Sequence, residues 1–500
     1  MHVLEGLGPQ EQRNTTWSFE HPYDHPYFGQ LFLGGALGTI SYPDSINPEI
    51  GDVKSIEVLH LVPRILMAII AVTDTFLIYK IAERRYNNRN VAFIAAILFA
   101  VMPMSWLVRR VLLDSLFMPF LLLSILFAID IKKRNAKNSV NSNFRLGSKI
   151  NPDNRGSLLI ILSGIFLGLA VFTKITAFTF IPVVGLLVFT NIDRDWTRLG
   201  VWLVPVVLIP MIWPLYAIAA GEWENWLSGL FWQTTEARGP NRPIWNSIFD
   251  ILKIDPVLFT IGMLGVLYAM IKKDCLIILW VVPFIVFYYF VGHLRDIHWI
   301  PIIPAFCIGV ALLVVGMSNR ISSKMVREVA LITIFSTIAI FGLGITAILV
   351  SLDLNSTFFE IYAFISVYLP SQDRSDTSED KTIIMGNNWM QIFSWIPKYV
   401  FDKDHDFKTF KRFVGSVKEP NLPVREGEKV LLLVDGGDHK RFILSETTKK
   451  NIQQKLFYNE TKLIKEFKGG NNERDWKEYP YVTVGENPGI ARGVEVRSNY

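Results

Sequence analysis

Cysteine is nearly absent from this chain of 500 residues, and charged residues are sparse. The only two cysteines, Cys275 and Cys307, lie in or beside apolar segments, which excludes a disulfide framework as the basis of the fold. Charged residues make up 19% of the sequence, and a formal net charge of only +5 does not indicate a nucleic-acid partner. No standard metal-ligand spacing appears, so we expect neither a metal nor another cofactor.

Long apolar runs dominate the sequence instead. Apolar residues make up 51% of the chain, and segments long enough to cross a bilayer recur between residues 61 and 350. The pattern predicts a polytopic α-helical membrane protein with about ten spans. The expected spans are 61–82, 91–108, 112–130, 157–172, 176–190, 199–219, 257–271, 275–292, 298–316 and 328–350.

Basic residues between the expected spans predict the orientation of the chain. The basic loops are 83–90, 131–156, 272–273 and 320–327. Alternation of the spans puts all four loops on one side of the membrane, which the positive-inside rule assigns to the cytoplasm. Residues 1–60, the loop 220–256 and the chain after residue 351 are then expected on the outer side.

The composition changes at both ends of the apolar region and predicts four parts. They are an outer loop at 1–60 with a juxtamembrane helix near 28–42, a transmembrane domain at 61–350, a linker at 351–370 and a small extracytoplasmic α/β domain at 371–500. In the last part, strands are expected at 382–385, 429–434 and 481–484, and a helix at 445–457.

A charged motif, RRVLLD, interrupts the apolar region at Arg109, Arg110 and Asp114. If a helix begins at about Arg110, then Arg110 and Asp114 share one of its faces. An arginine fork held by an acid suits a phosphate ligand. The alternative is an interfacial ion pair with arginines that extend to the membrane surface.

The string EHPYDHPY places Glu20, His21, Asp24 and His25 within a few residues of one another. Each histidine precedes a proline, which favours extended backbone and excludes a regular helix. Metal binding is chemically conceivable, but the spacing fits no standard ligand set. We therefore expect a rigid polar loop over a site.

Other polar residues lie at the ends of apolar runs. Lys174 interrupts the stretch FTKITAF, and Arg295 and His298 come just before another expected span. Charges at the membrane edge either line a functional cavity or extend to the interface. Asp74, inside the first expected span, is expected to form a hydrogen bond between helices rather than a catalytic contact.

The loop 220–256 combines several tryptophans with Arg238 and Arg242. Tryptophan is common at membrane interfaces, which is one interpretation of the loop. The aromatic rings and arginines could also stack on sugar rings and hold a phosphate. The sequence does not separate these two interpretations.

Several motifs, in order, resemble those of the protein O-mannosyltransferase and aminoarabinose-transferase group, which are GT-C-type glycosyltransferases (glycosyltransferase family 39 and relatives). The motifs cover roughly residues 20–310. They are DHPYFGQLFLGG, VPRILMAI with Arg64, YKIAERRYNNRNVAFIAAILFAVMP, RRVLLDS, GLAVFTKITA and HWIPIIPAF.

The resemblance implies roles for individual residues. The family begins with a transmembrane helix and an outer loop whose acidic residue is the base; neither precedes the motifs here, so we expect Met1 to be internal to a longer gene product. Otherwise Glu20 or Asp24 would have to act as base, with Asp114 orienting an arginine or the acceptor. The expected donor-phosphate residues are Arg64, Arg109, Arg110, Lys174, Arg295 and His298, and the expected acceptor-loop residues are His21, His25, Arg238 and Arg242.

The same resemblance implies a function. It suggests an inverting transferase that moves mannose or a similar hexose from a polyprenyl-phosphate donor to a protein, lipid or glycan acceptor at the outer face of the cell membrane. An oligosaccharyltransferase-like enzyme and a lipid-linked sugar flippase or transporter are alternatives. A transporter should show internal repeats and polar residues at mid-bilayer, and the sequence shows neither clearly.

Overall fold

The structure is a computed structural model, and its described residues form two compact units. One unit comprises residues 34–63 and the chain from 349 onward, and the other comprises 21–33 and 64–348. The described residues are 23, 25–141, 153–235, 244–292, 294–351, 356–373, 383–386, 411–412, 429–435, 461–467 and 494–499.

The larger unit is a bundle of apolar helices. Among the described residues, six helices are long and apolar enough to cross a membrane, or seven if one bent pair counts as a span. The total of about ten spans stays a prediction. The helices are α1 (Phe28–Gly38), α2 (Val53–Tyr86), α3 (Arg89–Val101), α4 (Leu113–Asn141), α5 (Asp153–Thr173), α6 (Ile181–Asn191), α7 (Trp196–Ala219), α8 (Trp223–Thr235), α9 (Ile244–Ile254), α10 (Pro256–Ile271), α11 (Cys275–Val291), α12 (Ile303–Ser318) and α13 (Lys324–Ser351).

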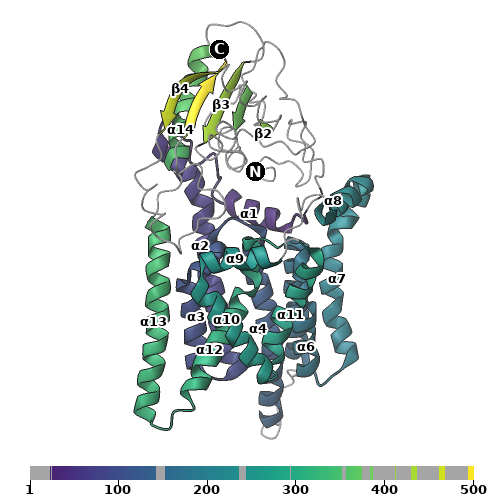
Figure 1. Ribbon diagram of the computed structural model, residues 1–500. Helices are drawn as coiled ribbons and strands as arrows, with labels where there is room; N and C mark the ends of the chain where they lie inside the picture. The colour runs from purple at the N-terminus through teal and green to yellow at the C-terminus, as the bar shows by residue number, and fades with distance from the viewer. Residues whose placement is uncertain are drawn as a thin grey trace. The chain divides into compact units, whose positions relative to one another are not determined.

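The helices differ in how much protein surrounds them. In the apolar segment that contains α12, 78% of the residues are buried, whereas in α13 only 11% are buried. Helix α13 stands at the edge of the bundle (Figure 1). An exposed apolar surface as large as that of α13 is unfavourable in water but suits contact with lipid. Helix α12 is therefore central, and α13 faces the hydrocarbon.

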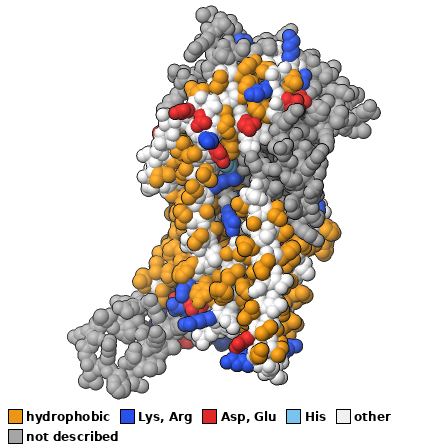
Figure 2. All heavy atoms as spheres, turned by 90° about the vertical axis from the view of Figure 1, so that its left-hand side faces the viewer, with side chains coloured by type: hydrophobic (Ala, Val, Ile, Leu, Met, Phe, Trp, Pro, Cys, Tyr) orange, Lys and Arg blue, Asp and Glu red, His pale blue; other side chains and the backbone are white. Residues whose placement is uncertain are grey.

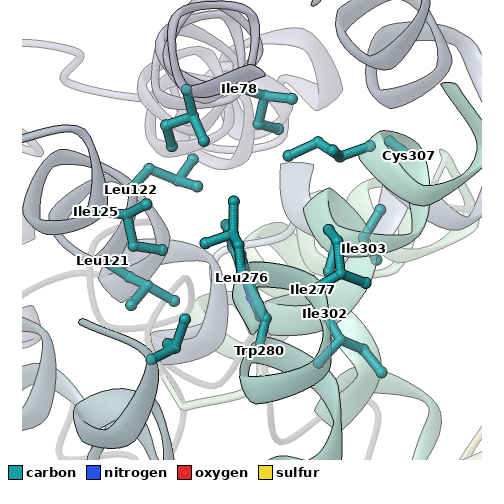
Figure 3. Close-up of a cluster of buried hydrophobic side chains, with 14 of the residues drawn as sticks. Ile78, Leu121, Leu122, Ile125, Leu276, Ile277, Trp280, Ile302, Ile303 and Cys307 are labelled. Atoms are coloured by element: carbon teal, nitrogen blue, oxygen red, sulfur yellow. The ribbon is translucent and has the colours of Figure 1, made fainter. Parts of the chain in front are cut away.

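Side chains from several helical segments meet in one part of the apolar core (Figure 3). Ile78 of α2, Leu122 of α4, Ile277 of α11 and Cys307 of α12 lie around one apolar cluster and are fully buried. The polar atom of the central tryptophan is satisfied, because Trp280 Nε1 donates to a backbone carbonyl 3.0 Å away. The cluster thus meets the requirement that buried polar groups find partners.

The expected span 91–108 is broken rather than straight. Helix α3 ends at Val101, and the 3-10 helix η1 (Pro103–Arg109) is bent by 71° from it. Met102 has extended backbone, which the residue before a proline prefers. The proline therefore ends the helix inside the apolar run.

Side chains satisfy the backbone carbonyls that this break exposes. A helix end leaves carbonyl groups without helical donors, which is costly where water is excluded. The Arg109 guanidinium donates to the carbonyl of Ala100 at 2.8 Å. The Thr346 hydroxyl of α13 donates to the carbonyl of Val101 at 2.7 Å. Arg109 thus stabilises the fold at the break.

The expected interhelical hydrogen bond of Asp74 is absent among the described residues. Asp74 is fully buried, and neither of its carboxyl oxygens has a hydrogen-bond partner there. The residues one helical turn away on the same face, Ile70, Leu77 and Ile78, are buried and apolar. The prediction was wrong because the surface that α2 packs against here is hydrophobic.

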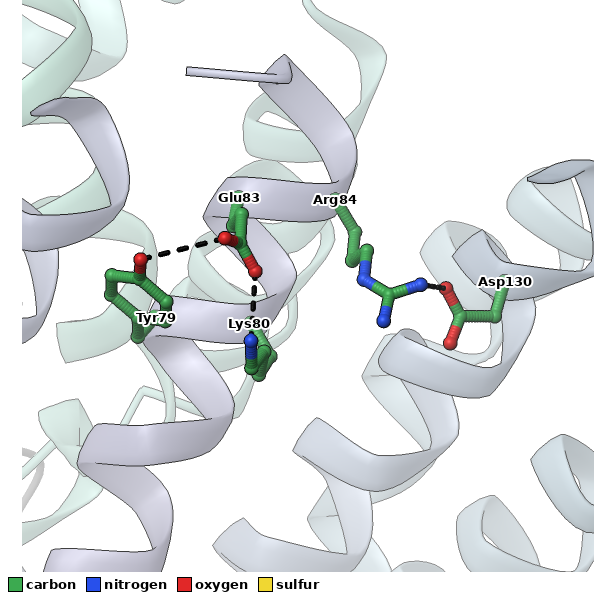
Figure 4. Close-up of polar contacts among 5 residues, drawn as sticks. All are labelled: Tyr79, Lys80, Glu83, Arg84 and Asp130. Atoms are coloured by element: carbon green, nitrogen blue, oxygen red, sulfur yellow. Dashed lines mark hydrogen bonds and ion pairs between the residues drawn. The ribbon is translucent and has the colours of Figure 1, made fainter. Parts of the chain in front are cut away.

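A cluster of charged residues lies near the C-terminal end of α2 (Figure 4). Lys80 Nζ and Glu83 Oε2 are 2.9 Å apart, and the Tyr79 hydroxyl is 3.4 Å from Glu83 Oε1. Arg84 forms an ion pair of 3.0 Å with Asp130 of α4. These contacts connect the ends of α2 and α4 at the same side of the bundle.

Two of the predicted basic loops lie at this end. Arg85, beside the 83–90 turn, is 3.7 Å from Asp274, which directly follows Lys272 and Lys273. Arg64 lies about 20 residues before Arg84 on the same helix, hence roughly 30 Å away, which matches the hydrocarbon thickness of a bilayer. The face shown in Figure 2 is largely hydrophobic, with charged side chains at its lower edge and others in its middle and upper parts.

The smaller unit contains a mixed sheet of strand order β2-β1-β3-β5-β4. Strand β1 runs parallel to β2 and β3, and β5 runs antiparallel to β3 and β4. The strands are β1 (Ile383–Gly386), β2 (Lys411–Arg412), β3 (Val430–Asp435), β4 (Lys462–Phe467) and β5 (Val494–Ser498). The expected strands at 382–385 and 429–434 are confirmed; the segments 445–457 and 481–484 lie outside the described residues.

The segment 351–370, expected as a linker, is largely helical. Helix α14 (Ser356–Asp373) has buried Phe358, Ile361, Tyr362 and Ile365, which follow helical spacing. Its Phe364 ring packs against Phe467 of β4 with centroids 5.7 Å apart. The segment therefore forms part of the smaller unit.

We predict that Gly265→Ala destabilises the bundle. A Cβ at Gly265 would lie 2.4 Å from the backbone of Gly309, so α10 and α12 would have to separate. Such overpacking typically costs about 1–3 kcal/mol. The measurement is thermal unfolding of the purified protein in detergent. Gly344→Ala is the matched control because a Cβ there meets nothing within 4 Å; equal melting temperatures of the two variants would contradict the packing.

Candidate functional site

Three breaks in the apolar helices lie around the start of α4. They are the 3-10 helices η1, η2 (Ile175–Phe180) and η3 (Asp296–Ile302). Helix α4 begins a few residues after η1, whereas α6 and α12 follow η2 and η3 directly. All three contact α4, and η1 also contacts η3. Segments far apart in the sequence thus meet at one end of the bundle.

Each break carries a basic residue with extended backbone. Lys174 precedes η2, Arg295 precedes η3, and Arg110 follows η1. A proline lies at the first or second position of η1, α6 and α12, where it is compatible with a helix start but not with a continuing helix. The prolines thus mark the start of the helical segment at each of the three breaks.

The centre of the site is a buried ion pair between Asp114 and Lys174. Their side chains are 3% and 9% exposed, and Lys174 Nζ contacts Asp114 Oδ2. The other carboxyl oxygen, Oδ1, is buried and has no hydrogen-bond partner among the described residues. A buried charge pair needs such mutual contact to offset the loss of hydration.

This pair corrects the predicted partnership of Asp114 with an arginine. Helix α4 begins at Leu113, so Arg110 is not on it and shares no helix face with Asp114. The Arg110 guanidinium lies instead over the Trp106 ring, 4.9 Å from its centroid. The helix begins later than expected because η1 occupies the preceding residues.

Four further predicted phosphate residues lie near one another in the described structure. Arg110 interacts electrostatically with Arg64, Arg295 and Asp296. The Arg295 backbone N–H donates to Nδ1 of His298 at 3.1 Å, so a neutral His298 ring carries its proton on Nε2. Three arginines with a single nearby acid make this cluster favourable for an anion.

Tyr288, which the sequence did not indicate, lies near the ion pair. Tyr288 of α11 lies near Asp114 and Thr176, and its ring stacks on His298 with centroids 4.9 Å apart. In the sequence, Tyr288 is one of several aromatic residues in an apolar run, and nothing distinguishes it. Only the packing of α11 against η2 and the neighbouring residues reveals it.

His25 interacts electrostatically with Lys174. Burial, together with the Lys174 ammonium, lowers the pKa of His25 to about 4. The imidazole is therefore neutral near pH 7. Tyr27, two residues further, packs edge-on against Phe172 with centroids 5.0 Å apart. Glu20, His21, Asp24, Arg238 and Arg242 lie outside the described residues.

Tryptophans from the 220–256 loop join this aromatic group. Trp226 of α8 packs edge-on against Trp213 of α7 at 5.5 Å and stacks on Trp223 at 4.8 Å. Trp213, Tyr23, Tyr27 and Phe172 form one buried cluster. The tryptophans are therefore structural partners of the N-terminal loop, a contact that neither sequence interpretation included.

The described helices form an apolar bundle with basic residues at its broken helices. Residues 18–224 match the family of dolichyl-phosphate-mannose-protein mannosyltransferases. The match confirms the resemblance over these residues, which include Arg64, Arg110, Asp114 and Lys174. No curated protein matches the chain.

Solved membrane proteins with related architecture show low identity. The oligosaccharyltransferase of Archaeoglobus fulgidus, with a tethered acceptor peptide, has 12% identity and a TM-score of 0.49; the alignment covers 89% of this chain and 65% of that protein. ArnT of Cupriavidus metallidurans, bound to undecaprenyl phosphate, has 12% identity and a TM-score of 0.45, with coverage of 96% and 88%. The chain thus spans less than two thirds of the first of these proteins.

We predict that Lys174→Met destabilises the bundle more than the double variant Asp114→Leu, Lys174→Met. Removing one partner leaves a buried, uncompensated charge, at about 3–5 kcal/mol, whereas an apolar pair avoids it. Melting temperatures of the two variants in detergent test this. A double variant less stable than the single one would show that the ion pair is not the dominant interaction at the site.

Proposed function

We propose that this protein is a membrane glycosyltransferase that binds a polyprenyl-phosphate sugar at the Asp114–Lys174 site. The supporting observation is the set of basic residues at the breaks around α4, which form a cationic site at one end of an apolar bundle. Lipid chains can lie against the hydrophobic surface of the helices, while the phosphate contacts the cations. We infer that the sugar is mannose or a similar hexose, as the family match suggests.

Two parts of the chain contribute to the proposed phosphate site. Arg64, Arg110 and Lys174 lie within the family match, whereas Arg295 and His298 lie beyond it. In the structure, Arg110 interacts electrostatically with Arg64 and Arg295. These interactions support a phosphate site built from both parts of the chain. Planar guanidinium groups suit a phosphate with two parallel hydrogen bonds, and a lysine adds a point charge.

The chemistry of transfer explains why cations matter. When the bond between the anomeric carbon and the phosphate oxygen breaks, the electron pair leaves with the phosphate. Negative charge then increases on the leaving group, and cations fixed in a site shielded from water stabilise it. In this scheme, Asp114 positions the Lys174 ammonium through their ion pair. His298, whose Nδ1 accepts the Arg295 N–H, supplies a further donor through Nε2.

We predict that Lys174→Ala and Arg110→Ala each weaken binding of undecaprenyl phosphate. Loss of one hydrogen bond to a charged group is worth roughly 1.5–3 kcal/mol, or about 10- to 100-fold in affinity. Binding of a fluorescent undecaprenyl-phosphate analogue to the detergent-purified protein measures this. Lys272→Ala is the control, a basic residue at the opposite end of the bundle. If all three variants bind like the parent, the phosphate site is elsewhere.

We propose that the phosphate site and the smaller unit face the outside of the cell. The basis is the concentration of basic loops beside the other end of α2, which the positive-inside rule places in the cytoplasm.

This orientation is testable with single cysteines. In a chain carrying Cys275→Ser and Cys307→Ser, Lys462→Cys on β4 should react with a membrane-impermeant maleimide in intact cells. Ser323→Cys, exposed between α12 and α13, should react only after permeabilisation. The reverse pattern would invert the topology and move the proposed reaction to the cytoplasmic face.

A further inference from the structure

Asp255 forms the corner between α9 and α10 and is fully buried. Its backbone N–H donates to the carbonyl of Ile251 at 2.8 Å, and its own carbonyl accepts from the N–H of Phe259 at 3.2 Å. Pro256 follows at the start of α10, where a proline is compatible with a helix. A buried carboxylate therefore stands at the point where one helix ends and the next begins.

The two oxygens of this carboxylate serve different segments of the chain. Oδ1 of Asp255 accepts from the N–H of Leu258 at 2.8 Å, which caps α10. Oδ2 accepts from the N–H of Met104 at 3.1 Å, in the first turn of η1. The first N–H groups of a helix have no helical acceptor, and a buried one needs a partner from elsewhere. Asp255 thus caps α10 and also holds the start of η1.

The 3-10 helix η1 connects this contact to Arg110. Met104 lies at the start of η1 and Arg110 directly after its end, about 12 Å further at roughly 2 Å per residue. The backbone N–H of Arg110 donates to the carbonyl of Leu107 at 3.2 Å, and its guanidinium lies 4.9 Å from the centroid of the Trp106 ring. Both the backbone and the side chain of Arg110 are therefore held by η1, which Asp255 holds in turn.

The same corner also holds the break that carries Arg295. Trp299 of η3 donates through Nε1 to the hydroxyl of Ser247 in α9 at 2.7 Å, and both residues are buried. The Trp299 ring packs edge-on against Phe259 of α10, with centroids 5.3 Å apart. Arg295 directly precedes η3. Two breaks that carry basic residues are thus fixed to the α9–α10 corner.

The basic residues need such support because they have the same charge. Arg110 has Arg64 and Arg295 as electrostatic neighbours. Like charges repel, so the guanidinium groups would move apart unless the backbone around them is held in place. Donors that are already in position bind a ligand more tightly, since the cost of ordering them is not part of binding. A contact that fixes η1 therefore favours binding of an anion.

We propose that Asp255 is a positioning residue for the phosphate site, an inference that rests on the proposed glycosyltransferase function. By accepting the Met104 N–H it fixes η1, and η1 keeps the Arg110 guanidinium in place for the donor phosphate. Asp255 acts through the backbone of η1. The competing interpretation is that Asp255 caps α10 and contributes only to the stability of the bundle.

The test is Asp255→Asn in the full chain. Asparagine is as good an N-cap as aspartate, so α10 keeps its cap, but an amide nitrogen replaces Oδ2 and cannot accept the Met104 N–H. Affinity for the fluorescent undecaprenyl-phosphate analogue should fall by about tenfold, the lower end of the effect expected for removal of Arg110 itself. The measurement uses the detergent-purified protein.

Asp195→Asn is the matched control, because Asp195 caps α7 beyond the end of α6 that is remote from η2. Its Oδ1 alone accepts from the N–H groups of Thr197 and Arg198, at 2.9 and 3.2 Å, so asparagine can keep both bonds. This variant should bind the analogue like the parent chain. Asp255→Ser keeps one capping oxygen and also lacks the second acceptor, and it replaces Asp255→Asn if melting shows that the latter fails to fold.

A double-mutant cycle separates positioning from a general effect on stability. If Asp255 acts through Arg110, then Asp255→Asn should cause little further loss of affinity in a chain that already carries Arg110→Ala. If Asp255 contributes only to stability, the two losses of affinity should multiply.

The outcomes distinguish the two proposals. If the parent chain does not bind the analogue, or if Arg110→Ala binds it like the parent, the proposed phosphate site fails and the role of Asp255 fails with it. If Arg110→Ala weakens binding but Asp255→Asn binds as tightly as Asp195→Asn, only the role of Asp255 is overturned. The same holds if the losses in the double variant multiply.

Discussion

The burial of a lysine against an aspartate at the edge of an apolar bundle is the interaction on which the proposed site depends. Lys174 and Asp114 come from segments sixty residues apart, and their contact requires both α4 to begin and α5 to end at the same level. A charge placed alone at this depth would be strongly unfavourable. The pair therefore fixes how α4, η2 and the loop carrying His25 meet. The arginines lie around this ion pair.

Broken helices make this arrangement possible and also create a problem for the backbone. Each break moves a basic residue out of helical geometry, but it also leaves peptide groups without their helical partners. At the end of α3, Arg109 and Thr346 supply the missing donors. Arg109 was expected to contact phosphate, yet its guanidinium already serves a carbonyl. Neighbouring arginines in one motif thus have different tasks, one structural and one available to a ligand.

The sequence predicted the helical membrane class and most apolar segments, because hydrophobic length is a local property. It also singled out Lys174, Arg110 and Asp114, because charges inside apolar runs are conspicuous. It did not predict the Asp114–Lys174 pair, since the start of α4 is set by the η1 turn and by packing against η2. Tyr288 was missed for the same reason: its neighbours come from other helices. Helix α14 lies in the segment expected as a linker, although most of its residues are apolar.

The helices that border the site are unusually short for membrane spans. Helix α10 has 16 residues and α11 has 17, which corresponds to lengths of roughly 24–26 Å, against about 30 Å for the hydrocarbon layer. As spans, they would draw the two lipid leaflets toward each other, because the bilayer adjusts to short hydrophobic segments by thinning. Headgroups beside α11 would then lie deeper than in the surrounding membrane. A lipid-borne phosphate would meet the cations with less displacement from its own leaflet, and membrane thickness would influence how readily the donor enters.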